Sequence, residues 1–331
     1  MFDHILVPLD RSALAECALP HAGAMARAFG SRVTLLHVID APRFAEAALP
    51  INPLEWQLKR AEAQCYMQDI VRRLEGEGIQ AASRITEGAP AEQILDVAKA
   101  EGVDLIVCSS HGFSGLSEWN VSSVVQKVAL RAYTSLMIVR AHKATQDALV
   151  VGANEPHYRR VLVPMDGSQR AEYVIPVVTR FALQGSHILL AHVVQRPEMP
   201  RRTPLTRLDN ELSERYVTCN RIEAEHYLRD LRSRLPGDVE SRVIVSDHVS
   251  RTLHELADQE DVDLVLASAH GYSGQSLWPF GSVANSFIAF GSRTLLIVQD
   301  AQPPAEGLFR SAAMATTPVR SIFGFRGEKA R

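Results

Sequence analysis

The sequence predicts an α/β protein built from two tandem copies of one doubly wound, five-stranded parallel-sheet domain. Three observations predict it: the length of 331 residues, a set of motifs that occurs twice in the same order, and short apolar runs that alternate with helical patterns. A chain of this length with 46% hydrophobic residues exceeds one ordinary core and suits two domains of about 150 residues.

The duplication rests on two blocks of residues. Val-Pro-x-Asp ends at Asp10 and again at Asp166, 156 residues later. Ser-x-His-Gly follows an apolar run and ends at Gly112 and again at Gly271, 159 residues later. Two ordered blocks at nearly equal spacing indicate a repeated domain rather than a chance match.

The repeat divides the chain. We expect the first domain at residues 1–143, a linker at 144–158, the second domain at 159–301 and a flexible C-terminal tail at 302–331. The tail is rich in Pro, Ala, Ser and Gly and carries five Lys or Arg against two Glu, so we expect a solvated segment.

Each copy contains five short apolar runs without polar alternation, which is typical of strands buried on both faces of a parallel sheet. The runs are residues 4–9, 33–39, 82–86, 103–108 and 135–140 in the first copy, and 160–165, 187–194, 241–246, 262–267 and 294–299 in the second. Ser12 and Ser168 are expected N-caps of the first helices, which Pro20 and Pro176 should kink.

Candidate binding residues follow the first and fourth strands of each copy. In open parallel sheets, ligands bind beyond the carboxyl ends of the strands, where the strand order reverses. Ten residues after Gly271, Gly281-Ser282-Val283 opens an apolar helix, and the same step from Gly112 reaches Ser122-Ser123-Val124. Glycine permits close approach of phosphate, and a helix N-terminus offers unpaired N–H groups along a favourable dipole. Glycines and a helix N-terminus in this arrangement are typical of a nucleotide-binding pocket.

The same residues also have ordinary structural interpretations. Glycine, serine and aspartate are what turns use, so a single such loop would favour ordinary turn chemistry. His111 and His270 either contact a ligand or cap the strand end. Trp119 and Trp278 shield a base or, as the favoured alternative, pack at an interface.

The motifs together resemble the universal stress protein family. The resemblance covers residues 3–141 and 159–299 and rests on Val-Pro-x-Asp, on His37-Val38 and His192-Val193, and on Gly-x-x-Gly-x9-Gly-Ser, each in order and twice. It implies the adenine nucleotide alpha hydrolase-like fold, with strand order 3-2-1-4-5, and ATP binding in one branch of the family. It also implies that the fifth strands pair domain to domain.

The resemblance assigns the binding residues by position. Asp10 and Asp166 would face adenine, Val38 and Val193 would line its pocket, and the loops after the fourth strands would hold ribose and phosphates. The loop residues are Ser109, Gly112, Ser122 and Ser123 in the first copy, and Ser268, His270, Gly271, Gly281, Ser282 and Val283 in the second.

The two copies depart unequally from the family motif. Ser109 and Ser268 replace its first glycine, and Ser122 replaces a later one in the first copy alone. An added Cβ at a site of close approach blocks or shifts phosphate. We therefore expect ATP, with or without Mg²⁺, to favour the second domain, and we assign no protein side chain as a metal ligand.

The overall composition and charge limit the classes of binding partner that we expect. A formal net charge of −3 gives no reason to expect nucleic acid or an anionic membrane as partner. The four scattered cysteines, the absence of a signal-like start and the absence of a long apolar run indicate a cytoplasmic protein. An intramolecular pair of domains is expected, and a homodimer of whole chains stays open.

Three functions remain. The first is a nucleotide-binding protein of stress response or signalling, and the second is a nucleotide-free interaction module of the same fold. The weakest is a slow ATPase, because no P-loop, GxGxxG or GxSxG motif and no evident general base is present. We assign no catalytic residue.

Overall fold

The computed structural model describes residues 1–40, 53–112, 115, 121–141, 156, 158–197, 206–272 and 278–300. Most of the expected linker and the whole expected tail lie outside these residues, so the predicted domain boundaries stay predictions. We call residues 1–141 the first repeat and residues 158–300 the second repeat.

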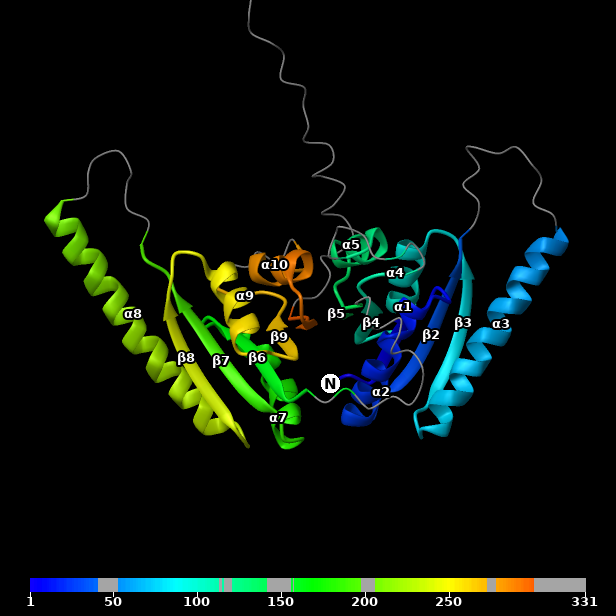
Figure 1. Cartoon of the computed structure of the whole chain (residues 1–331), viewed down its shortest axis with the longest axis horizontal. Helices are drawn as coiled ribbons and strands as arrows, with labels where there is room; N and C mark the ends of the chain where they lie inside the picture. Colours follow the sequence, from blue (N-terminus) through cyan, green and yellow to red (C-terminus); the bar gives the residue numbers. More distant parts are fainter. Residues whose placement is uncertain are drawn as a thin grey trace, which may run out of the picture. The chain divides into compact units, whose positions relative to one another are not determined.

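The two repeats contain the same elements in the same order (Figure 1). The first repeat contains β1 (His4–Pro8), α1 (Ala13–Glu16), α2 (Ala18–Phe29), β2 (Arg32–Ile39), α3 (Pro53–Gly76), β3 (Ala81–Glu87), α4 (Pro90–Ala100), β4 (Leu105–Ser109), α5 (Ser123–Ala129) and β5 (Ser135–Val139). The second contains β6 (Arg160–Met165), the 3-10 helix η1 (Ala171–Val174), α7 (Ile175–Leu183), β7 (His187–Val194), α8 (Arg207–Arg234), β8 (Val239–Val245), α9 (Val249–Gln259), β9 (Leu264–Ser268), α10 (Ser282–Phe290) and β10 (Thr294–Val298). All ten predicted strands are present.

Two strands begin later than their apolar runs. Val103 and Val262 open the predicted fourth strands, but β4 and β9 start two residues further on. The N–H groups of these valines donate to Ala98 O at 2.9 Å and to Ala257 O at 3.0 Å, at the ends of the preceding helices. The valines are apolar because they are buried in the turn, not because they belong to the sheet.

The ten strands form one sheet in the order β3-β2-β1-β4-β5-β10-β9-β6-β7-β8. Neighbours within a repeat are parallel, which confirms the expected order 3-2-1-4-5 twice. β5 and β10 pair antiparallel, with Met137 opposite Leu296. Without this pairing, β5 and β10 would each be an exposed edge strand. Their pairing within the chain satisfies both edges, as the family resemblance implied.

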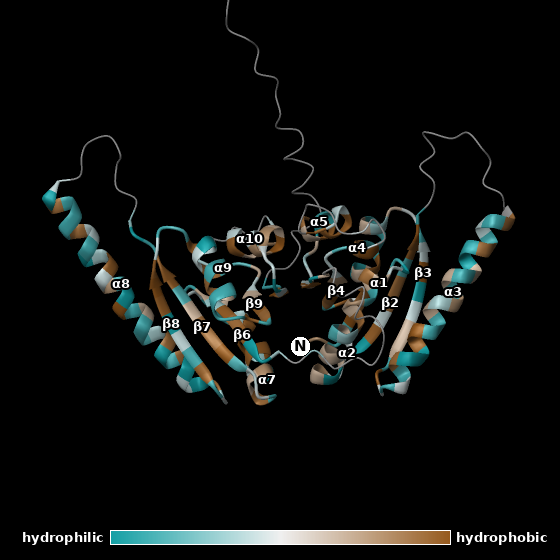
Figure 2. Ribbon diagram, in the orientation of Figure 1, coloured by the Kyte–Doolittle hydropathy of each residue, from teal (hydrophilic) through white to brown (hydrophobic). Residues whose placement is uncertain are grey.

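A core lies on each face of the sheet and draws on both repeats. One face is covered by α1, α2 and α3 with η1, α7 and α8, and the other by α4, α5, α9 and α10. Successive residues of β5 alternate between the cores, with Met137 in one and Ile138 in the other. Figure 2 shows the apolar colouring concentrated in the strands and mixed colouring along α3 and α8.

The first helix of each repeat differs from expectation. The hydroxyls of Ser12 and Ser168 each accept the N–H group three residues on, at 3.1 Å. Ser12 is the N-cap of α1 as predicted, whereas the N-cap of η1 is Arg170 and not Ser168. The prolines do not kink one continuous helix, because the helix is interrupted before them. Pro20 lies in the first turn of α2 and Pro176 at the start of α7, where a missing N–H costs no helical hydrogen bond.

The strand order places a switch point in each repeat. β1 lies between β2 and β4, and β6 between β7 and β9, so the loops at their carboxyl ends diverge to opposite faces. Within the described ranges, no helix is both long and apolar enough to cross a bilayer.

Candidate functional site

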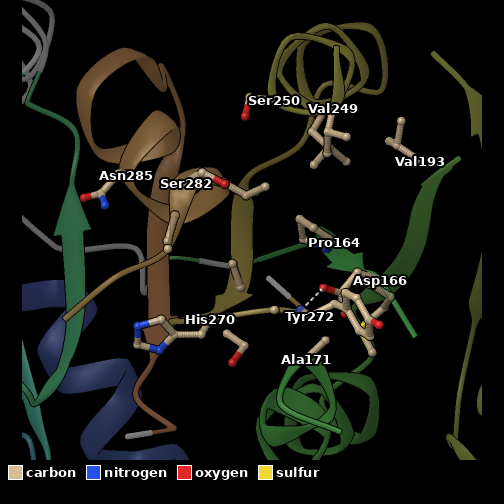
Figure 3. A pocket seen from close by; sticks show the side chains of 18 of the residues that line it. Pro164, Asp166, Ala171, Val193, Val249, Ser250, His270, Tyr272, Ser282 and Asn285 are labelled. Atoms are coloured by element: carbon tan, nitrogen blue, oxygen red, sulfur yellow. Dashed lines mark hydrogen bonds between the residues drawn. The ribbon is translucent and has the colours of Figure 1, made fainter. Parts of the chain in front are cut away.

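A pocket of about 1340 Å³ opens beyond the carboxyl ends of β6, β7 and β9. We call it the second-repeat pocket. Its lining includes all eight residues that the sequence assigned to this repeat: Asp166, Val193, Ser268, His270, Gly271, Gly281, Ser282 and Val283. Figure 3 shows Asp166, Pro164 and Val193 on one side and His270 with Ser282 on the other. The predicted residues are therefore brought together.

Gly271 packs directly against Asp166. A Cβ at Gly271 would lie 2.1 Å from Asp166 Oδ2, so only glycine fits there. The same Oδ2 accepts the N–H of Tyr272 at 2.6 Å, and Oδ1 accepts the N–H and hydroxyl of Ser168 at 3.0 and 2.6 Å. The carboxylate is thus fixed at the mouth of the pocket.

The first repeat builds the same pair. A Cβ at Gly112 would lie 2.1 Å from Asp10 Oδ2, and Asp10 Oδ1 accepts the N–H and hydroxyl of Ser12 at 3.0 and 2.5 Å. The Ser-x-His-Gly motif is therefore a fixed partner of the aspartate that ends the first strand. This contact explains why both blocks of the repeat occur together.

The repeats differ at the helix that follows the loop. Ser122 is the N-cap of α5 and its hydroxyl accepts the N–H of Val125 at 3.3 Å. Gly281 is the N-cap of α10 and no side chain caps that helix. The first N–H groups of α10 face the pocket without competition from a cap, whereas Ser122 already occupies one in the first repeat.

The serines at the first motif position bind the scaffold. Ser268 Oγ donates to Arg170 O at 2.8 Å, and Ser109 Oγ accepts from the Cys17 thiol at 3.4 Å. Burial raises the pKa of Cys17, and the Ser109 contact opposes that rise. Ser268 thus connects the end of β9 to the segment after β6, and Ser109 connects the end of β4 to Cys17, between α1 and α2.

The two histidines next to the motif glycines are buried in protein contacts. His270 Nε2 lies 2.7 Å from Trp278 O and its Nδ1 lies 2.7 Å from Asp300 Oδ1. His111 Nδ1 lies 3.1 Å from Ser110 Oγ. Of the two alternatives for His270, the contacts favour a structural one, since both ring nitrogens face protein oxygens.

One side of the second-repeat pocket is apolar. Pro164, Val193 and Val249 line it, and Figure 3 shows their side chains near Asp166. His192 also lines the pocket, and burial lowers its pKa while Asp166 raises it. Trp278 lines the pocket with 65% of its surface exposed, so shielding of a base and packing at an interface both stay open for it. Trp119 lies outside the described residues.

The first-repeat residues lie at equivalent places. Asp10 follows β1, Val38 is in β2 and packs against the core, and Ser109 and Gly112 end and follow β4. Ser123 is the first residue of α5. Residues 113, 114 and 116–120, which belong to this loop, lie outside the described ranges, so we describe no pocket there.

Sequence reasoning missed Arg170 and Asp300. Arg170 Nε donates to Asp300 Oδ2, and Asp300 contacts His270, so a charged network lies behind the pocket. The signal was available, because at the repeat offsets these residues correspond to Leu14 and Ala141. A charged pair at positions where the other copy is apolar marks a difference between the repeats. In the described part of the chain, no three His, Cys, Asp or Glu residues form a potential metal site.

The comparisons with known proteins agree with this arrangement. The model of the universal stress protein family matches residues 1–140 and 157–313. Universal stress protein MJ0577 of Methanocaldococcus jannaschii is 32% identical over 155 residues, which are 42% of this chain and 96% of that protein. Universal stress protein YxiE of Bacillus subtilis is 30% identical over 149 residues, 42% of this chain and 100% of that protein.

Solved structures match the whole tandem. A universal stress protein from Archaeoglobus fulgidus matches at a TM-score of 0.59 and 15% identity, covering 89% of this chain and 98% of that one. A putative universal stress protein from Pseudomonas aeruginosa matches at 0.58 and 15% identity, covering 90% and 93%. These likenesses show a shared fold. The chain belongs to the universal stress protein family and carries that domain twice.

Proposed function

We propose that this protein binds an adenine nucleotide, ATP, in the second-repeat pocket and acts in a cytoplasmic stress or signalling response. The observation that carries the proposal is the start of α10. Gly281 begins this helix with no side-chain cap, at a pocket that also holds Asp166 and an apolar wall. An open helix N-terminus opposite a base-sized apolar surface suits a nucleoside phosphate.

The base belongs on the apolar side. Pro164, Val193 and Val249 offer flat contact, and Asp166 lies beside them with its orientation fixed by Tyr272 and Ser168. A carboxylate oxygen accepts a hydrogen bond from an exocyclic amino group or a ribose hydroxyl. This combination supports adenosine as the nucleoside.

The phosphates belong at α10. The helix dipole and the first N–H groups favour negative charge, and the Ser282 hydroxyl adds a donor. A Cβ at Gly281 would lie 3.3 Å from Ala269 O, so the turn is tight where the backbone must approach the ligand. Any Mg²⁺ would arrive with the phosphates and be held chiefly by them.

We propose the second repeat ahead of the first for two reasons. Ser122 caps its own helix in the first repeat and so competes with phosphate for an N–H. The rim of the second-repeat pocket carries His248 and Arg251, where the offset of 159 residues places Ala89 and Glu92 in the first. An arginine at this position favours a polyanion more than a glutamate does, with Arg251 paired to Glu255 at 2.8 Å and Glu92 to Arg131 at 3.8 Å.

The test is a pair of binding measurements. The purified protein is denatured and any released nucleotide is identified by mass spectrometry, and ATP is then titrated into wild type, Gly281→Asp and Ser122→Asp. Aspartate is a good N-cap, so both helices should form, but its charge opposes phosphate. We expect Gly281→Asp alone to abolish binding.

Each contrary result has a distinct meaning. Wild type that neither carries nor binds adenine nucleotide at millimolar concentration overturns the proposal and favours a nucleotide-free interaction module. Loss of binding in Ser122→Asp but not in Gly281→Asp moves the site to the first repeat.

A further inference from the structure

A buried network of three charged or polar side chains lies behind the second-repeat pocket. Asp300 is its centre: Oδ1 lies 2.7 Å from His270 Nδ1, and Oδ2 accepts from Arg170 Nε. The Asp300 side chain is 0% exposed, that of His270 is 1% exposed and that of Arg170 is 31% exposed. A carboxylate buried this deeply is stable only with such partners.

Both ring nitrogens of His270 contact protein oxygens. Nε2 lies 2.7 Å from Trp278 O and Nδ1 lies 2.7 Å from Asp300 Oδ1. The ring is therefore fixed between Asp300 and the segment that precedes α10.

The network joins three segments of the chain: Arg170 follows β6, His270 follows β9, and Asp300 follows β10. The first two of these segments contribute residues to the pocket lining. Through Trp278, His270 also contacts the segment that leads into Gly281, whose Cβ position is 3.9 Å from His270 Cδ2. The network is thus connected to the start of α10.

The first repeat lacks this network. Leu14 and Ala141 stand at the positions of Arg170 and Asp300, and both are buried apolar residues. The Ser110 hydroxyl instead accepts the Ala141 N–H at 3.0 Å and lies 3.1 Å from His111 Nδ1. The ion pair of Arg170 with Asp300, and the contact of Asp300 with His270, therefore occur in the repeat that has the uncapped helix.

We infer that Arg170, Asp300 and His270 form a positioning unit that holds the phosphate end of the second-repeat pocket in place for a nucleoside polyphosphate. The inference rests on the proposed function. His270 contacts protein oxygens with both ring nitrogens, so it acts through the segment that leads to Gly281, at the start of α10 where the phosphates would bind. The unit therefore acts on phosphates and not on the nucleoside.

The test separates these two parts of the ligand. ATP and adenosine are titrated calorimetrically into wild type, Asp300→Asn and Asp300→Ala, the latter giving the residue of the first repeat. We expect ATP to bind about tenfold more weakly to both variants, the scale of one charge-assisted hydrogen bond, and adenosine to change by less than about twofold. Asp238→Asn is the control. Asp238 Oδ2 lies 2.8 Å from His187 Nδ1, and neither residue lines the pocket.

A spectroscopic arm tests the unit without ligand. Nitrogen NMR of His270 in the nucleotide-free protein should show a hydrogen bond at Nδ1 in wild type that is lost in Asp300→Ala. If the Asp300 variants fail to fold, Arg170→Leu keeps the carboxylate on His270 and should weaken ATP without changing adenosine.

Three results would overturn the inference: full ATP affinity in a folded Asp300→Asn protein, equal losses for ATP and adenosine, or an Nδ1 signal of His270 that is the same in wild type and Asp300→Ala. Wild type that binds neither ligand would instead overturn the proposed function, and the NMR result would then decide whether the network exists as described.

Discussion

Gly271 lies against Asp166 so closely that a Cβ on the glycine would be 2.1 Å from the carboxylate Oδ2. This oxygen accepts the N–H of Tyr272, so the glycine allows the loop after β9 to wrap onto the end of β6. The relationship is repeated between Gly112 and Asp10. It joins the two blocks of residues by which the duplication is recognised.

Gly271→Ala should break this contact. The Cβ forces Asp166 away from the Tyr272 N–H, and we expect a loss of about 2 kcal/mol in the free energy of unfolding, together with weaker ATP binding. Urea unfolding and ATP titration measure the two effects. Gly112→Ala is the matched control, with a similar cost in stability but unchanged ATP binding.

Gly76→Ala gives a second control, since a Cβ at Gly76 meets nothing within 4 Å at the end of α3. We expect its stability to stay at or slightly above wild type, by less than about 1 kcal/mol. A Gly271→Ala protein as stable as Gly76→Ala would show that Asp166 relaxes without cost.

Gly281→Ser should exchange binding for a helix cap. In the first repeat, Ser122 caps the N–H three residues on, and a serine at 281 would reach the N–H of Ala284 in the same way. We expect ATP affinity to fall several-fold while the free energy of unfolding changes by less than about 1 kcal/mol. Unchanged affinity in the calorimeter would mean that this N–H does not meet phosphate.

The fold was predictable because its strands are short apolar runs and its motifs occur twice. The ten strands, their order and the pairing of β5 with β10 followed from these patterns and from the family resemblance. The site was predictable as a set of positions, but not the partner of each atom. Gly271 was assigned to a loop that would hold ribose and phosphates, and its close approach to Asp166 was not predicted.

Contacts between distant residues explain what the sequence did not reveal. Asp300 lies 30 residues from His270 and Arg140 lies 147 residues from Phe287, and no local period relates such residues. In the sequence, a single charged residue at the end of an apolar strand looks the same whether its side chain is buried or exposed to solvent. Only the fold shows that Asp300 and Arg140 are buried against particular partners.

Arg140→Met should weaken the contact between the first and the second repeat. The guanidinium of this first-repeat residue donates from Nη2 to Phe287 O at 2.6 Å and Ile288 O at 3.2 Å, at the C-terminal end of α10. Burial lowers the pKa of Arg140 to about 10, which shows the cost of placing the charge there. Its removal leaves buried carbonyls without these donors, and we expect a loss of about 2 kcal/mol in urea unfolding.

Arg207→Met is the control for this change. Arg207 is almost fully exposed and pairs with Glu211 four residues on, an interaction worth less than about 0.5 kcal/mol. If Arg140→Met costs no more than Arg207→Met, the link between β5 and α10 rests on the strand pairing alone.

His21 should make the protein sensitive to acid. Its Nδ1 lies 2.5 Å from the Tyr158 hydroxyl, between α2 and the start of the second repeat, and burial lowers the pKa of His21 to about 4. In the unfolded chain His21 has the ordinary pKa of 6.5. Between that pH and about 4, His21 is therefore protonated in the unfolded chain but not in the folded protein. Stability therefore falls as the pH drops from about 6.5 towards 4, by roughly 3 kcal/mol in total.

His21→Gln removes that titration, so urea unfolding at pH 7 and pH 4.5 should show a smaller difference than in wild type. His226→Gln is the control, because His226 lies exposed on α8 and its loss should leave the pH dependence unchanged. The comparison uses the difference between the two pH values, because glutamine itself can alter the packing equally at both. An acid loss in His21→Gln as large as in wild type would place the sensitivity in other groups and leave Tyr158 as a packing contact only.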